Sequence, residues 1–133
     1  MKYILDTNIC IYLIKKKPAS VFDNLLQMEP GDIGISSITV AELEYGVQKS
    51  KQVEKNQEAL DLFIAPFEVI QFDQTAAKEY GIIRTGLERK GKPIGAYDLL
   101  IAAQARDRGL ILVTNNTREF KRIPNLLIEN WVT

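Results

Sequence analysis

The sequence predicts an α/β protein in which helices cover both faces of a central, mostly parallel sheet. Short apolar runs alternate with helical segments along the whole chain, which is the pattern of βαβ units. The length of 133 residues suits one compact domain, residues 1–133, and a composition of 46% hydrophobic and 26% charged residues is ordinary for a globular protein. We therefore expect a single three-layer α/β/α sandwich, without repeats or linkers.

The expected elements follow one another in strand–helix order. Five apolar runs are expected as strands: Tyr3–Leu5, Ile33–Ser36, Glu68–Gln71, Leu110–Val113 and Leu126–Ile128. Helices are expected over the segments between them: Ile9–Lys15, Ser20–Met28, Ser37 or Thr39 to near Ser50, Gln52–Ala65, Asp73 to near Lys90, and Tyr97–Arg108. Two segments rich in Gly and Pro are expected as a turn and a loop: Pro30–Asp32 and Gly91–Gly95.

Most of these helices carry a local signal for where they begin or end. Thr7 and Asn8 are good caps for the first helix, Pro66 stops the fourth, Asp73 caps the fifth, and Gly109 closes the last. Four residues of the fifth helix are spaced as one buried stripe: Ala76, Tyr80, Ile83 and Leu87.

The composition excludes several kinds of chemistry. The chain has no histidine, which removes Ser-His-Asp and Cys-His schemes and histidine-ligated zinc. Cys10 is the single cysteine, so neither a disulfide framework nor a thiolate zinc site is expected. The sequence contains no dinucleotide or P-loop fingerprint, and no apolar run approaches the ~20 residues of a membrane span. We expect a cytosolic protein whose chemistry, if it is an enzyme, rests on carboxylates.

Three carboxylates fall where such chemistry is expected. Asp6 follows the first strand, and ligands of parallel α/β sheets bind beyond the carboxyl ends of strands. Glu42 lies early in a helix with apolar residues on two sides, and Asp98 opens a helix that is apolar almost all round. Each acid alone also fits a simpler role, as an N-cap or as a first-turn partner of the helix dipole.

The three acids become informative if the fold brings them together. Carboxylates ~4 Å apart repel by ~1 to ~4 kcal/mol per pair, so such a cluster needs protons or cations. Hard oxygen ligands suit Mg²⁺, with Mn²⁺ able to substitute. A further polar cluster follows the clearest strand, where Thr114 and Asn116 either orient water, metal or phosphate or form an Asn-rich turn.

The motifs around these acids resemble those of the PIN-domain ribonucleases, most closely the VapC toxins of toxin–antitoxin pairs. Four segments carry the resemblance in the right order along the whole chain: Ile4–Ile11 with Asp6, Ile38–Leu43 with Glu42 and Gly46 a turn later, Pro93–Asp98 with Asp98, and Val113–Phe120. The sequence departs from the family at Asn116, where many PIN domains have a fourth acid, with Glu119 one turn further on as a possible replacement.

The resemblance implies a PIN-like fold and Mg²⁺-dependent hydrolysis of RNA phosphodiester bonds. Asp6, Glu42 and Asp98 would hold the metal that activates water, with Asn116 as an orienting residue and Glu119 as a possible further ligand. The implied products carry 5′-phosphate and 3′-hydroxyl ends. The implied substrate is tRNA, cut in the anticodon stem–loop so that translation stops. The implied partners are a second copy of the chain and a VapB-type antitoxin that blocks the metal site.

Contacts to substrate and partners are expected around the acids. We expect five residues to contact RNA: Thr7, Asn8, Lys92, Thr114 and Arg118. The helix that carries Glu42 is apolar on two faces, one of which is a candidate surface for another chain. Three aromatic residues either join that surface or pack in the core: Tyr45, Phe63 and Phe67.

Two other functions compete with the nuclease interpretation. A phosphatase or phosphotransferase using Asp6 as nucleophile would want a second acid two residues later, where Asn8 stands, and gives Glu42 no role. A catalytically weak PIN-like module could bind RNA or protein without cutting. The retention of three acids argues against such a module, and calorimetry with Mn²⁺ would discriminate.

Overall fold

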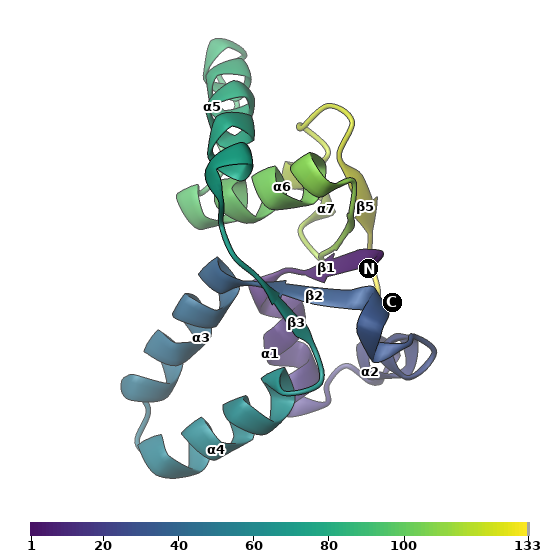
Figure 1. The fold of residues 1–133 in the computed structure, drawn as a ribbon, viewed down its shortest axis with the longest axis vertical. Coiled ribbons are helices and arrows are strands. Elements are labelled where there is room, and N and C mark those ends of the chain that lie inside the picture. Colours follow the sequence, from purple (N-terminus) through teal and green to yellow (C-terminus); the bar gives the residue numbers. More distant parts are fainter. Residues whose placement is uncertain (133) are drawn as a thin grey trace.

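The computed structural model describes residues 1–132 and shows one five-stranded parallel sheet between two layers of helices (Figure 1). The strands lie in the order β3-β2-β1-β4-β5. Their bounds are β1 Tyr3–Leu5, β2 Ile33–Ser36, β3 Glu68–Ile70, β4 Ile111–Val113 and β5 Leu127–Glu129. The predicted three-layer α/β/α fold class is thereby confirmed.

The chain enters the sheet at its centre. β1 pairs with β2 on one side and with β4 on the other, so that Leu5 has both Ile35 and Val113 as partners. From β1 the chain builds outward through β2 to β3, then crosses back to β4 and finishes at β5. The strand order therefore reverses between β1 and β4. In open parallel sheets ligands bind beyond the carboxyl ends of strands at such a reversal, and Asp6 and Thr114 directly follow these two strands.

Helices cover the sheet on both faces, in two groups that Figure 1 shows on opposite sides of the strands. One group comprises α1 Thr7–Lys15, α2 Ala19–Leu26, α3 Ser37–Gln48 and α4 Val53–Ile64. The other comprises α5 Gln74–Arg89, α6 Ala96–Arg108 and the short α7 Thr117–Phe120. A 3₁₀ turn at Pro30–Asp32 leads into β2. Within residues 1–132, no helix is both long and apolar enough to cross a membrane.

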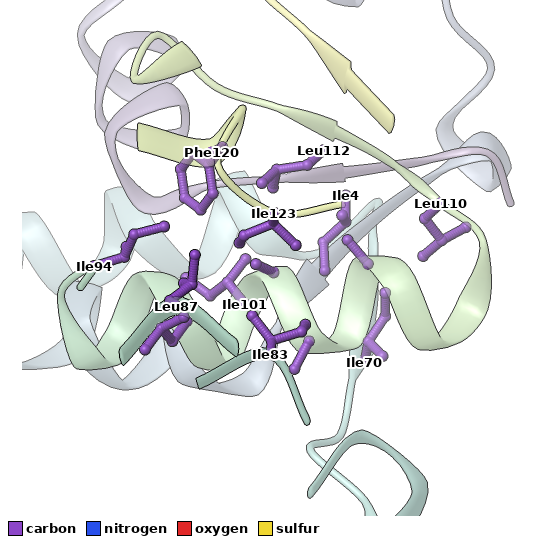
Figure 2. Close-up of a cluster of buried hydrophobic side chains, with 14 residues drawn as sticks. Ile4, Ile70, Ile83, Leu87, Ile94, Ile101, Leu110, Leu112, Phe120 and Ile123 are labelled. Atoms are coloured by element: carbon purple, nitrogen blue, oxygen red, sulfur yellow. The ribbon is translucent and has the colours of Figure 1, made fainter. Parts of the chain in front are cut away.

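Each face of the sheet has its own hydrophobic core. Because successive strand residues point to opposite faces, Ile4 lies in the core beside α5 and α6, whereas Leu5 lies in the core beside α1 to α4. Figure 2 shows the first core, in which Leu87 and Ile83 from α5 and Ile101 from α6 gather close to Ile4. The stripe predicted along the fifth helix is largely buried, with Tyr80 at its edge.

The structure corrects several details of the sequence prediction. The first helix begins at Thr7 and is capped by Asp6, not by Thr7 or Asn8. The helix α7 was not predicted, since four residues are too few to show a period. β1 and β2 have their expected bounds, and the other boundaries differ from the expected ones by at most two residues. Trp131, among the largest fully buried side chains, was also missed.

Candidate functional site

Asp6 lies at the centre of the candidate site. Its backbone N–H donates to the carbonyl of Val113 over 3.0 Å, which fixes it between the ends of β1 and β4. Its Oδ1 accepts from the N–H of Ile9 over 2.9 Å and so caps α1. The residue is 3% exposed, and this burial raises the pKa of the carboxyl from 3.8 to about 6. Asp6 is therefore both a helix cap and a buried carboxyl whose ionisation is disfavoured.

Glu42 approaches Asp6 from α3 and is held by hydroxyl groups. Thr7 Oγ1 donates to Glu42 Oε1 over 2.7 Å and lies 3.2 Å from the hydroxyl of the fully buried Thr39. The negative charge of Glu42 contributes to the raised pKa of Asp6, which places the two carboxylates within electrostatic reach of each other. Glu42 is itself half-buried, as the apolar residues on two sides of its helix predict.

Asp98 approaches the same point from the first turn of α6. Burial raises its pKa first, and the neighbouring charges of Glu42 and Glu119 raise it further. Asp98 also raises the pKa of Asp6, so the acids form one electrostatically coupled group. Glu119 belongs to this group through Asp98, and its Oε2 accepts from Asn116 Nδ2 over 2.8 Å. The amide at position 116 thus holds an acid in place.

Thr114 lies beneath Asp6 and is fully buried. Its Oγ1 accepts from the backbone N–H of Asn116 over 2.9 Å, and its side chain hydrogen-bonds to Asp6, which partly offsets the rise in the pKa of that carboxyl. The structure revises the expectation that Thr114 contacts RNA, because the side chain has no exposed surface and its hydrogen bonds are used within the protein.

The donor set suits a divalent cation. Carboxylate oxygens are the ligands that Mg²⁺ and Mn²⁺ prefer, and a cation would relieve the cost of ionising buried Asp6. The ligand shell is not preformed: within residues 1–132, no group of three or more His, Cys, Asp or Glu side chains is arranged to hold a metal ion as it stands. Glu42 is instead engaged by Thr7. The residues fit a metal by chemistry and charge, and binding one would draw the acids closer.

Comparison with known proteins identifies the family. The PIN domain model matches residues 3–126. The chain belongs to the PIN domain family. It is 54% identical to "Ribonuclease VapC2" of Rickettsia felis over 132 residues, and 47% identical to "tRNA(fMet)-specific endonuclease VapC" of Shigella flexneri over 131 residues, with 98% of both chains covered in each case.

Solved structures agree with this assignment. The complex VapBC2 from Rickettsia felis, bound to a DNA fragment from its promoter, contains a chain that matches with a TM-score of 0.93 at 52% identity, covering 99% of this chain and 100% of that one. DNA-bound VapBC from Salmonella typhimurium contains one that matches with a TM-score of 0.94 at 46% identity, covering 99% of each chain. This PIN domain is thus a nuclease of the VapC type, as its motifs predict, and neither the non-catalytic module nor the phosphatase gains support.

A groove lies beside the acids of this PIN domain, between α1, α3 and α4. Its volume is about 670 Å³, and Thr7, Asn8 and Glu42 contribute to its lining. Exposed Tyr45 also lines it, whereas Phe63 and Phe67 pack edge-to-face against each other, 5.4 Å apart, at the margin of the core. Of the three aromatic residues considered for a surface, Tyr45 is the exposed one, and Phe63 and Phe67 are partly buried against the core.

The remaining expected contacts lie at the rim of the site. Asn8, Lys92 and Arg118 are all exposed, so they are free to meet a substrate. Sequence reasoning missed Thr39, which supports Thr7, and the pair Ser36 and Gln104, which joins the helices that carry two of the acids. The contacts of Thr39 with Thr7 and of Ser36 with Gln104 have no local signal, because the partners lie more than thirty residues apart in the sequence.

Proposed function

We propose that this PIN domain is the toxin of a VapBC-type pair and hydrolyses tRNA with the help of Mg²⁺ held by Asp6, Glu42 and Asp98. The observation that carries the proposal is the convergence of acids from β1, α3 and α6 at the reversal of strand order. The ion, when bound, supplies charge stabilisation at the phosphate and a lowered pKa for a coordinated water; Mn²⁺ would substitute.

The chain's own residues prepare this chemistry in three ways. A cation would relieve the cost of keeping buried Asp6 ionised, a cost that appears as the rise in the pKa of its carboxyl to about 6. Thr7 orients Glu42, and Asn116 orients Glu119 as a possible further ligand. Exposed Lys92 and Arg118 would neutralise phosphates of the RNA backbone. A water attacking in line would leave 5′-phosphate and 3′-hydroxyl ends, with no role for the 2′-hydroxyl of the substrate.

The proposed substrate is tRNA, cut in the anticodon stem–loop so that translation stops. The relatives from Shigella flexneri and Salmonella typhimurium, both 47% identical, are named tRNA(fMet)-specific endonucleases. Initiator tRNA is therefore the first substrate to test. The related structures are VapBC complexes, so we propose a VapB-type antitoxin as partner, covering the groove between α1, α3 and α4, and a homodimer of the toxin.

The test is a cleavage assay on initiator tRNA and an elongator tRNA, with Mg²⁺, with Mn²⁺ or with EDTA. The variant Asp6→Asn removes the central acid, and Asp61→Asn, at an exposed position on α4, is the matched control for loss of one charge. We expect discrete fragments of initiator tRNA from the wild type and from Asp61→Asn, and none from Asp6→Asn or in EDTA. Cleavage that persists in EDTA would disprove the metal mechanism. Cleavage of neither tRNA would disprove the proposed substrate, and equal cleavage of both would disprove a preference for initiator tRNA.

A further inference from the structure

A buried hydrogen bond joins the two helices that carry Glu42 and Asp98. Ser36 is the N-cap of α3, and its hydroxyl donates to Gln104 Oε1 on α6. Both side chains are inaccessible to solvent, with 0% and 1% exposure. The same serine oxygen accepts from the N–H of Ile38 over 3.0 Å, so one hydroxyl starts α3 and ties it to α6.

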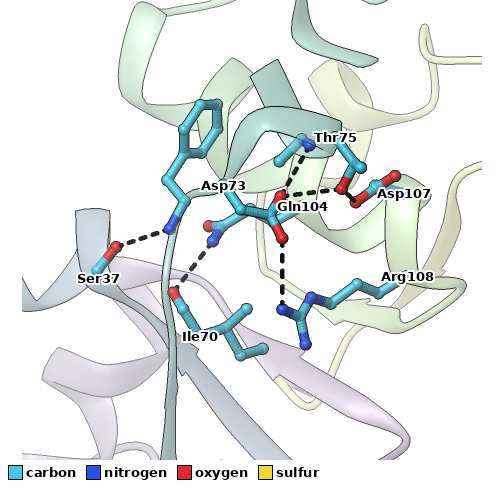
Figure 3. Close-up of polar contacts among 9 residues, drawn as sticks. Ser37, Ile70, Asp73, Thr75, Gln104, Asp107 and Arg108 are labelled. Atoms are coloured by element: carbon cyan, nitrogen blue, oxygen red, sulfur yellow. Dashed lines mark hydrogen bonds and ion pairs between the residues drawn. The ribbon is translucent and has the colours of Figure 1, made fainter. Parts of the chain in front are cut away.

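The other end of the Gln104 amide reaches the neighbouring strand. Its Nε2 donates to the carbonyl of Ile70, the last residue of β3, over 3.1 Å (Figure 3). Nearby, Ser37 accepts from the backbone N–H of Phe72 over 3.2 Å, which fixes the chain just after β3 to the start of α3. A single amide therefore sets α6 against both β3 and the N-cap of α3.

We propose that Gln104 is a positioning residue that sets the separation of Glu42 and Asp98. The inference rests on the function proposed above. Ser36 precedes Glu42 by six residues, and Gln104 follows Asp98 by six, so each anchor stands ~9 Å along its helix from the acid. Since helices are stiff over this length, a shift at the anchor is carried to the carboxylate.

The choice of residue supports a positioning role over simple packing. Gln104 lies among fully buried apolar residues of α6, Ile101–Ala103 and Ala105, where an apolar side chain would fill the space without desolvating an amide. Only an amide offers a donor and an acceptor on one rigid group, which is what Ile70 and Ser36 require. The polar pair therefore specifies how the helices meet, which packing alone defines less sharply.

The test measures Mn²⁺ affinity by calorimetry and by electron paramagnetic resonance, on full-length protein at a temperature where every variant is folded. Gln104→Met keeps the length of the side chain but loses both hydrogen bonds. Ser36→Ala removes the hydroxyl that donates to Gln104 and caps α3, and it serves if Gln104→Met does not fold. The matched control is Ile83→Ala, which weakens the packing of α5 on α6 but leaves Ser36 and Gln104 intact.

We expect Gln104→Met to bind Mn²⁺ about 10-fold more weakly, the lower end for residues that orient metal ligands. The double variant with Ser36→Ala should lose less affinity than the two single losses added together, because both changes break the hydrogen bond between Ser36 and Gln104. The inference is overturned if Gln104→Met binds as the wild type does, or if Ile83→Ala loses as much affinity. Absence of Mn²⁺ binding by the wild type would instead refute the metal assignment, and this inference with it.

Discussion

Replacing Asp6 by Asn should make the metal-free protein more stable while abolishing its activity. Burial raises the pKa of the Asp6 carboxyl from 3.8 to about 6, so ionising it in the folded protein costs about 3 kcal/mol more than in the unfolded chain. Asn carries no charge and remains a good N-cap for the N–H of Ile9. The bond from Thr114 is already included in that pKa, so the expected gain at pH 8 is about 3 kcal/mol.

The raised pKa of Asp6 determines how the stability difference between Asp6→Asn and the wild type depends on pH. Because the folded state holds the Asp6 proton more tightly, the cost of ionisation is absent below the unfolded pKa of 3.8 and develops as the pH rises through about 6. The advantage of Asp6→Asn should therefore open between these two values. Thermal unfolding followed by circular dichroism in EDTA should show a melting temperature about 10 °C above the wild type at pH 8, and little difference at pH 4.

Adding Mg²⁺ completes the experiment. The ion binds only the folded protein, so it should raise the melting temperature of the wild type at pH 8 and leave Asp6→Asn unchanged. A variant no more stable than the wild type at pH 8 without metal would refute the reasoning. So would a stability difference that is the same at pH 4 and pH 8, since it would then not arise from the ionisation of Asp6.

Three further predictions concern the hydrogen bonds and charges of the site. At subsaturating Mg²⁺, kcat/KM for tRNA should fall about tenfold per pH unit below pH ~6, as Asp6 becomes protonated, whereas a flat profile from pH 5 to 8 would contradict the pKa assignment. Thr7→Val should weaken Mg²⁺ activation about 10-fold by releasing Glu42, and Thr7→Ser should restore it, as measured by titrating the metal in the cleavage assay. Asn116→Asp should lower the metal-free melting temperature at pH 8, because a carboxylate replaces the donor to Glu119, and should enlarge the rise that Mg²⁺ produces; an unchanged Mg²⁺ effect would place position 116 outside the site.

Much of the fold could be predicted because its signals are local. Apolar runs bounded by turn residues identified all five strands, and Gly109, in the left-handed conformation, closes α6 as expected. The details that failed depend on partners distant in sequence. The end of a strand depends on its pairing with the neighbouring strand. β3 ends at Ile70, which pairs with Ser36, so the predicted strand was one residue too long at Gln71. Trp131 is buried against Tyr3, 128 positions away, with ring centroids 5.9 Å apart.

In the candidate site, as in the fold, some features have local sequence signals and others depend on partners distant in sequence. The places of the three acids have local signals, because Asp6 caps α1 and Glu42 and Asp98 lie in the first two turns of α3 and α6. The hydrogen-bonding roles of the threonines have no such signal. Thr7 meets Glu42 across 35 positions, and the fully buried Thr114 hydrogen-bonds to Asp6.

Capping a helix and serving a site turn out to be compatible uses of one polar group. A carboxylate has two oxygens and about four lone pairs, so the N–H of Ile9 occupies only a part of the capacity of Asp6. The cap bond also fixes the rotamer, which a ligand needs and a flexible surface acid lacks. Ser36 also has two hydrogen-bonding roles, since its oxygen caps α3 while its hydroxyl donates to Gln104. At the reversal of strand order, the cap bond of Asp6 thus holds its carboxylate in a fixed orientation toward a ligand. The role of Asp6 as a helix cap and its proposed role as a metal ligand are therefore compatible.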